Sequence, residues 1–187
     1  MMSNLYFTSD WHVGHKNIQK LRTFVSSEAH NEQLIIRGCR NLTKRDTLYL
    51  LGDICFTEDS LKFISDLPKC KKILIKGNHD LVDTRKLLEV FDEVHGHHRT
   101  KKYWLNHCPI HPDELRGRWC IHGHVHYATL PDGRYLNVCP EYTLDHFGSY
   151  LVSLDDVKKY FGQGGIGVIE PKINPWPLGL LPLPPKG

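Results

Sequence analysis

Four short apolar runs along this chain each lead into a small residue and then an Asp, Asn or His, and this pattern constrains the fold most. The runs cover residues 5–8, 47–51, 72–75 and 119–121, and they lead into Ser9-Asp10, Gly52-Asp53, Gly77-Asn78 and Gly123-His124. Runs of this length and composition are typical of buried strands. The polar residues that follow them then lie on loops at one edge of a sheet, where α/β proteins build their sites.

The remaining pattern predicts helices between and after these strands. Helix-like stretches cover residues 18–26, 28–41, 60–67 and 154–161, and further short extended runs lie near residues 93–95, 102–105, 135–138 and 149–152. Strands and helices alternate in the first half of the chain, and short strands dominate the second half. This order predicts an α/β fold with two sheets packed face to face and helices outside.

The composition is that of an ordinary globular domain. With 187 residues, 40% hydrophobic and 24% charged, the chain is long enough for one domain with a sizeable core. No apolar run approaches the roughly 18 residues that a membrane span needs, so we expect no membrane partner. A net charge of +3 is too small to indicate a nucleic-acid partner by itself.

The amino-terminus and the cysteines indicate where the chain resides. Residues 1–8 have neither the basic start nor the apolar stretch of a secretory signal. The six cysteines occur without any C-x-x-C pair, at Cys39, Cys55, Cys70, Cys108, Cys120 and Cys139. We therefore expect reduced thiols, no structural zinc site and a cytoplasmic location.

The composition changes near the carboxyl end, where six prolines recur among leucines between residues 171 and 185. Neither a helix nor a central strand tolerates that density of proline. We therefore divide the chain into a domain at residues 1–170 and an extended tail at residues 171–187. The tail either docks on a surface of its own domain or of a partner, or remains a flexible extension.

Seven potential metal ligands follow these strand-like runs in five separate clusters. They are Asp10, His12, Asp53, Asn78, His107, His124 and His126. Carboxylate, amide and imidazole donors in such numbers are what a hydrolytic site with two metal ions needs. Taken singly, Asp10 is better explained as a helix N-cap and Asn78 as a turn former, but together they favour ligands. In an extended segment, His124 and His126 would point to the same side.

The order D-x-H, G-D, G-N-H-D, an isolated His and G-H-x-H resembles the calcineurin-like metallophosphoesterases, in particular their small bacterial and phage-type members. The resemblance covers roughly residues 5–152. It implies a four-layer α/β/β/α sandwich with a dinuclear centre at the sheet edge. It also implies that Asp10, His12, Asp53 and His126 hold one metal ion. The second ion would be held by Asp53, Asn78, His107 and His124, so that the Asp53 carboxylate bridges both ions.

The resemblance also assigns candidate catalytic and substrate-binding residues. His79 matches the family histidine that contacts the scissile phosphate and protonates the leaving oxygen. We group Asp80 with it and expect a hydrogen-bond acceptor or turn former that orients its neighbours. Asn78 and His79 would contact substrate, and His15 and Arg99 are further candidates. His111 competes with His107 for the isolated ligand, but the sequence His107-Cys108-Pro109 favours His107.

One departure from the family pattern limits the classes of substrate that fit the sequence. The segment Gly52-Asp53-Ile54-Cys55-Phe56-Thr57 lacks the second Asp and the Arg of the G-D-x-V-D-R-G motif in serine/threonine protein phosphatases. An Asp-His dyad and an arginine clamp on the phosphate therefore cannot be carried over to this chain. A phosphoprotein substrate becomes less compatible with the sequence.

These features predict a phosphodiesterase that hydrolyses a small nucleotide, a cyclic nucleotide or a nucleic-acid end through attack of a metal-bridging hydroxide. The alternatives are a phosphomonoesterase acting on a small phosphorylated metabolite and a non-catalytic scaffold of the same fold. Manganese is the working choice for the two divalent ions, although iron, zinc and nickel also suit these donors.

Overall fold

The computed structural model describes residues 4–15, 17–18, 22 and 38–165 of the chain. Within these residues the chain forms a mixed α/β fold with two mixed sheets and four α-helices. Most of the two helices predicted at residues 18–26 and 28–41, and the whole proline-rich tail, lie outside the described residues.

The first sheet has five strands in the order β4-β3-β2-β1-β9. Their bounds are β1 Leu5–Thr8, β2 Thr47–Leu50, β3 Lys71–Ile75, β4 Glu93–His95 and β9 Val152–Ser153. Strands β1 to β4 are parallel, and β9 pairs antiparallel to β1. The predicted strands are confirmed here, although β9 begins three residues later than expected. Because β1, β2 and β3 run in the same direction, the loops after them meet at one edge of the sheet.

The second sheet has four strands in the order β5-β6-β7-β8. Their bounds are β5 His98–Arg99, β6 Tyr103–Leu105, β7 Trp119–His122 and β8 Tyr135–Asn137. The last three are parallel to one another, and β5 pairs antiparallel to β6. The carboxyl ends of β6 and β7 therefore deliver His107 and Gly123 to the same edge of this sheet. Strand β5 was not predicted.

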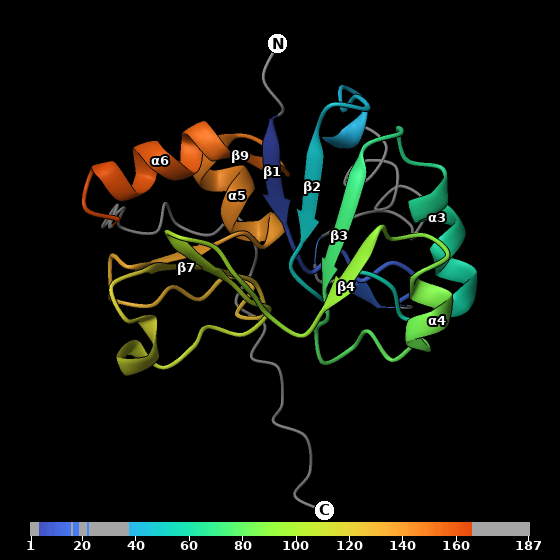
Figure 1. Cartoon of the computed structure of the whole chain (residues 1–187), viewed down its shortest axis with the longest axis horizontal. Helices are drawn as coiled ribbons and strands as arrows, with labels where there is room; N and C mark the ends of the chain where they lie inside the picture. The colour runs from blue at the N-terminus through green and yellow to red at the C-terminus, as the bar shows by residue number, and fades with distance from the viewer. Residues whose placement is uncertain (1–3, 16, 19–21, 23–37, 166–187) are drawn as a thin grey trace, which may run out of the picture.

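The helices lie on the two sides of the first sheet, as Figure 1 shows. On one side are α3 Leu61–Ser65 and α4 Thr84–Leu87, and on the other are α5 Pro140–Phe147 and α6 Leu154–Gly162. The predicted helices at residues 60–67 and 154–161 correspond to α3 and α6. Helix α6 begins with a capping box, in which Ser153 and Asp156 each bind the backbone N–H of the other. Helices α4 and α5 were not predicted.

Apolar residues are buried on both faces of the first sheet. In β3, Leu74 packs into the cluster that includes Ile64 of α3 and Leu87 of α4, whereas Ile73 and Ile75 pack into the opposite cluster. Successive side chains of a strand point to opposite faces, so a strand covered on both sides needs a continuous apolar run. The uninterrupted run of β3 is thereby explained.

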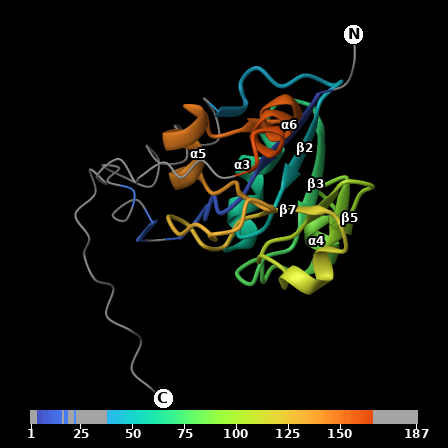
Figure 2. The same cartoon turned by 90° about the vertical axis from the view of Figure 1, so that its left-hand side faces the viewer.

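The second apolar cluster joins the two sheets and the carboxyl-terminal helices. It contains Phe7 of β1, Leu105 of β6, Ile121 of β7, Tyr142 of α5 and Phe161 of α6. Figure 2 shows α5 and α6 beside each other above the strands of the second sheet. This shared core fixes the positions of the two sheets relative to each other, and with them the loops at their edges.

A third, smaller cluster covers the other face of the second sheet. Leu115, Cys120 and Tyr135 are buried there, and Leu115 belongs to the 3-10 helix η3 Pro112–Leu115. A second 3-10 helix, η2 Glu58–Ser60, leads directly into α3. All six cysteines are free in the structure. Every helix in the described ranges is too short or too polar to pass through a lipid bilayer.

Candidate metal centre

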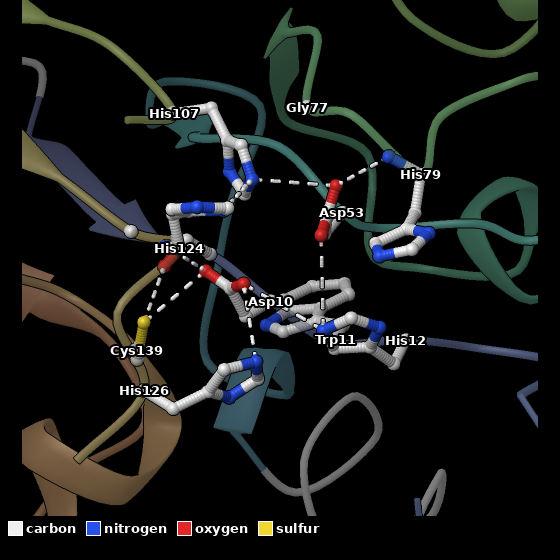
Figure 3. Close-up of polar contacts among 12 residues, drawn as sticks. Asp10, Trp11, His12, Asp53, Gly77, His79, His107, His124, His126 and Cys139 are labelled. Atoms are coloured by element: carbon white, nitrogen blue, oxygen red, sulfur yellow. Dashed lines mark hydrogen bonds and ion pairs between the residues drawn. The ribbon is translucent and has the colours of Figure 1, made fainter. Parts of the chain in front are cut away.

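The loops at the carboxyl ends of the parallel strands bring the predicted ligands together. Asp10 and His12 follow β1, Asp53 follows β2, Asn78 follows β3, His107 follows β6, and the pair His124 and His126 follows β7. Figure 3 shows the carboxylates of Asp10 and Asp53 among the imidazoles of the four histidines. The side chains form two groups, which we call the first and second donor groups.

The first donor group consists of Asp10, His12 and His126. The Oδ1 atom of Asp10 lies 3.6 Å from Nε2 of His12 and 3.8 Å from Nε2 of His126. One donor atom from each of the three residues lies within 4.8 Å of the others. This spacing is compatible with donors around one common ion.

The second donor group consists of Asn78, His107 and His124. Nε2 of His107 lies 2.9 Å from Oδ1 of Asn78 and 3.2 Å from Nδ1 of His124. The Asn78 and His124 side chains are exposed, whereas His107 is buried. The second group therefore faces the open side of the site.

The carboxylate of Asp53 lies between the two groups. Its Oδ2 atom is 3.9 Å from Nε2 of His12, and its Oδ1 atom is 3.4 Å from Nε2 of His107. Oδ1 also accepts a hydrogen bond from the backbone N–H of His79 at 2.8 Å. One oxygen thus faces each donor group, which is the arrangement that a bridging carboxylate requires.

The backbone at these positions is unusual. Six described residues other than glycine have positive φ, and five of them belong to the candidate site: Asp10, His12, Asp53, His124 and His126. Left-handed backbone is rare for such residues and concentrates at functional sites. Hydrogen bonds between the loops hold it in place, because the N–H groups of Asp10 and His12 donate to the carbonyls of Gly52 and Asp53, each at 2.9 Å.

The same backbone corrects one expectation about His124 and His126. The segment 123–126 is a turn with positive φ at both histidines, so their side chains do not point to one side as in a strand. His124 points to His107, whereas His126 points to Asp10. The turn thereby supplies one imidazole to each donor group.

Glycines allow the loops to approach the donors closely. A Cβ atom at Gly77 would overlap the carboxylate of Asp53, and one at Gly123 would overlap that of Asp10. A Cβ atom at Gly52, whose φ is +85°, would overlap the ring of His107. The glycines before Asp53, Asn78 and His124 are therefore required by space, and Gly52 also by its backbone conformation.

Asp80, which we grouped with His79, lies between the loops after β2 and β3. Its carboxylate is buried and accepts hydrogen bonds from the backbone N–H groups of Asp53, Ile54, Cys55 and Gly77 at 2.8 to 3.2 Å. Both oxygens are thus used to hold the loop after β2 against the loop after β3. The expectation that it orients its neighbours as a hydrogen-bond acceptor agrees with these contacts.

The local charges keep the two carboxyl groups ionised. Burial raises the pKa of Asp10, but its contacts with His12 and the nearby His126 outweigh burial and hold the pKa well below its ordinary value. The pKa of Asp53 is also lowered, because hydrogen bonding by His107 outweighs burial. Burial lowers the pKa of His107, but Asp53 and Asp10 more than reverse this and raise it. The donor groups therefore form a strongly coupled set of charges.

Unsatisfied polar atoms in the first donor group fit a cation. Oδ1 of Asp10 and both ring nitrogens of His12 are buried and have no hydrogen-bond partner among the described residues. Burying an ionised carboxylate without a partner is costly, and such groups normally pair with a charge or coordinate a metal. Oδ2 of Asp10, in contrast, accepts from the backbone N–H of His124 at 2.9 Å and from the thiol of Cys139 at 3.2 Å.

His79 and His15 lie beside the donor groups with Phe56 between them. The exposed His79 ring stacks on Phe56 with centroids 5.0 Å apart, and His15 meets the edge of Phe56 at 4.7 Å. The ring of His12 is 5.9 Å from each of the two other histidines. Both predicted substrate contacts are thus close to the first donor group.

Two further candidates lie elsewhere. Arg99 pairs with Trp104 in the middle of β6, and its guanidinium carbon lies 5.8 Å from the Trp104 ring. Its side chain is thus engaged away from the donors. His111 is exposed, caps η3 and lies 3.6 Å from Asp113, so the choice of His107 over His111 agrees with the structure.

The sequence analysis missed four residues that support the first donor group. Glu141 and Arg22 are buried and form an ion pair at 2.8 Å, and Glu141 also binds His126. Cys139 binds Asp10, and Asn137 binds the carbonyl of His126. These residues lie 11 to 129 positions from the donors they contact, and no local motif marks them.

Comparison with known proteins places this chain in a family. No protein-family model matches the sequence. The chain is 31% identical over 163 residues to the gene 66 protein of Mycobacterium phage L5, with 67% of this chain and 78% of that protein covered. The chain belongs to the gene 66 protein family. The uncharacterized protein MJ1445 of Methanocaldococcus jannaschii is also 31% identical, over 144 residues, with 73% of this chain and 77% of that protein covered.

A solved structure supports the fold of this gene 66 family member. The crystal structure of AQ665, a protein of unknown function from Aquifex aeolicus, superposes with a TM-score of 0.67 and 27% sequence identity. The superposition covers 84% of this chain and 98% of that one. The overall fold is therefore shared with that protein.

Proposed function

We propose that this protein is a calcineurin-like metallophosphoesterase that uses two divalent ions to hydrolyse phosphodiesters. One observation carries the proposal: seven donors scattered over the sequence converge into two groups with Asp53 between them. The proposal includes the four-layer α/β/β/α sandwich typical of that superfamily, with the donors at the edge of both sheets. Manganese is the proposed ion, and the free cysteines favour a cytoplasmic location.

The ions would be held by the residues that the two donor groups supply. Asp10, His12 and His126 would hold one ion, and Asn78, His107 and His124 the other, with one Asp53 oxygen for each. When bound, such a pair supplies Lewis acidity and an activated water for attack on phosphorus. The Oδ1 atom of Asp10 and the ring nitrogens of His12, which lack hydrogen-bond partners among the described residues, support this assignment.

His79 is the proposed proton donor to the leaving oxygen. Its backbone N–H donates to Asp53 at 2.8 Å, and its ring centroid lies 5.9 Å from that of His12. The stack on Phe56 restricts the ring, and exposure gives it access to substrate. A positioned general acid of this kind contributes roughly 10²- to 10⁴-fold in rate.

The lack of an arginine clamp in the sequence favours a diester over a monoester. His15, His79 and Phe56 border the first donor group, and the sequence lacks the arginine clamp of related protein phosphatases. A phosphodiester carries one negative charge, which the ions can balance, whereas a monoester dianion benefits from a fixed cation. We therefore propose a small nucleotide, a cyclic nucleotide or a nucleic-acid end as substrate.

The decisive experiment compares two chromogenic substrates with manganese present. The protein should hydrolyse bis-p-nitrophenyl phosphate faster than p-nitrophenyl phosphate. Hydrolysis of only the second compound would make it a phosphomonoesterase acting on a small phosphorylated metabolite. Hydrolysis of neither, with both ions bound, would indicate a non-catalytic scaffold. A screen of cyclic, linear and end-labelled nucleic-acid substrates then identifies the preferred diester.

The role of His79 is tested by His79→Ala. This variant should bind both ions like the unmodified protein and lose roughly 10²-fold or more in turnover. His146→Ala is a matched control, because His146 lies on α5 and binds the carbonyl of Tyr142. Unchanged turnover in His79→Ala would exclude the acid role without affecting the metal assignment.

A further inference from the structure

Three alternate residues in the segment 137–141 each contact the first donor group. The Nδ2 atom of Asn137 donates to the carbonyl of His126 at 2.8 Å, and the thiol of Cys139 donates to Oδ2 of Asp10 at 3.2 Å. Oε1 of Glu141 lies 3.0 Å from Nδ1 of His126. The end of β8 and the start of α5 therefore form a support behind one donor group.

Glu141 is the charged member of this support. Its side chain is 5% exposed, and the same Oε1 atom accepts from Nε of Arg22 at 2.8 Å. Arg22 is buried too, and its Nη2 atom donates to the backbone carbonyl of Asp10 at 2.5 Å. Glu141 thus connects His126 to the backbone of Asp10 through Arg22.

This contact determines which nitrogen of His126 is free. An ionised carboxylate only accepts hydrogen bonds, so Nδ1 of His126 must carry the proton that it shares with Glu141. Nε2 then presents its lone pair to the space beside Oδ1 of Asp10, 3.8 Å away. A carboxylate behind a ligating histidine fixes its tautomer and orientation and makes it a stronger ligand.

The second donor group has different support. Nδ1 of its buried His107 lies 2.9 Å from the backbone carbonyl of Leu51, and Nδ1 of His124 lies 3.2 Å from the ring of His107. Neither of these partners is a carboxylate. The two donor groups therefore differ in the charge that lies behind their histidines.

We propose that Glu141 is a positioning residue that sets the His126 tautomer and makes the first donor group the tighter of the two metal positions. This inference rests on the proposed function, because it assigns unequal affinities to the two ions. Glu141 holds the proton of Nδ1, Arg22 balances its charge, and Asn137 holds the left-handed backbone of His126. The first ion would then remain bound while the second exchanges.

The first test examines the unmodified, metal-free protein. Nitrogen-15 NMR of the imidazoles at mildly alkaline pH should show His126 protonated at Nδ1. His146→Gln helps to assign the spectrum without touching the donor groups. Protonation of His126 at Nε2 would overturn the proposal whatever its variants do.

The second test uses two conservative variants. Glu141→Asp keeps the charge beside Arg22 but shortens the side chain by one methylene, so the carboxylate withdraws from His126. Glu141→Gln keeps an acceptor at Nδ1 but removes the charge. In calorimetric titrations with Mn²⁺, Glu141→Asp should weaken the tighter site by about 10- to 100-fold and leave the weaker site unchanged. Glu141→Gln should retain the His126 tautomer and lose less affinity.

The controls separate this inference from the proposed function. Glu89→Gln removes an exposed carboxylate that pairs only with Lys86 in the described structure, at 3.7 Å, and should bind Mn²⁺ normally. Equal affinities in Glu141→Asp and the unmodified protein would contradict the inference alone. Failure of the unmodified protein to bind any divalent ion would contradict the proposed function and this inference together.

Discussion

The two donor groups use the same kinds of side chain in different surroundings. In the first group Asp10 and His12 are buried, at 0% and 6% exposure, whereas in the second Asn78 and His124 are exposed. A buried carboxylate lies behind a histidine of the first group, whereas the described partners of the Nδ1 atoms in the second are a backbone carbonyl and an imidazole. Under the proposed function, this difference predicts that the first position retains its ion and the second meets the substrate.

Of the substitutions considered, a change at Asp53 should reduce turnover and metal binding most, because the Asp53 carboxylate faces both donor groups. Asp53→Asn should lower turnover by about 10³-fold or more and reduce the number of bound ions, since a neutral amide is a weaker bridge. Metal analysis and kinetics on the same sample measure both. Asp66→Asn, at an exposed helix end, should leave them unchanged. Two tightly bound ions in Asp53→Asn would refute the bridging position.

Removing one imidazole from each group should give unequal results. His124→Ala should weaken the second ion by roughly 100-fold and leave one ion bound, because loss of a ligand costs at least as much as loss of its outer partner. His12→Ala should release the tightly held ion instead. Mn²⁺ titrations followed by electron paramagnetic resonance distinguish the two. Identical losses in both variants would mean that the donor groups are equivalent.

Asp80 holds the loops that carry Asp53 and Asn78, so substituting it should lower the free energy of unfolding. Asp80→Asn replaces one acceptor oxygen by an N–H donor facing backbone N–H groups. We expect a loss of about 2–4 kcal/mol in the free energy of unfolding without metal, the cost of several broken buried hydrogen bonds. Denaturant titration measures this, with Asp83→Asn on the exposed α4 cap as control. A loss under 0.5 kcal/mol would contradict the positioning role.

Acid should weaken the support of the first group. Burial raises the pKa of Glu141, but Arg22 and His126 outweigh it and lower the pKa from 4.5 to about 2. Glu141 therefore stabilises the folded state above pH 4.5, and this stability is lost as the pH falls toward 2. Denaturant titrations of the metal-free protein across this range should show a smaller pH dependence in Glu141→Gln. An identical dependence would assign the acid sensitivity to other carboxyl groups.

Phe56 should have the smallest effect. Phe56→Leu keeps an apolar side chain but removes the ring on which His79 stacks. Turnover should fall by several-fold while both ions bind as before, because the stack is worth about 1 kcal/mol. Phe63→Leu, on the partly exposed surface of α3, is the control. A loss as large as that of His79→Ala would indicate a direct contact of Phe56 with substrate.

The donors were predictable because each stands beside a local pattern. Asp53 follows an apolar run and a glycine, and the structure explains this order through the buried β2 and the close approach of Gly52 to His107. The helices were predictable to different degrees. Helices α3 and α6 follow their apolar periodicity, whereas α4 has only four residues, too few to display one.

Helix α5 could have been found, because Pro140 lies in its first turn and the left-handed Gly148 ends it. The contact between Glu141 and Arg22 could not have been predicted from the sequence. Their contact spans 119 positions, and only the packing of α5 near the first sheet brings them together. The direction of His124 and His126 also depends on left-handed backbone, which hydrogen bonds between distant loops impose.

The origin of the donors in both sheets has a mechanical consequence. Asp10 and Asp53 extend from the first sheet, His107 and His126 from the second, and the chain crosses between the sheets at residues 96–97. Metal ions bound by these residues would cross-link the two sheets at their shared edge, in addition to the apolar packing between their faces. Sliding one sheet past the other would then have to break coordination bonds first. Metal binding should therefore make the two sheets unfold as a single unit.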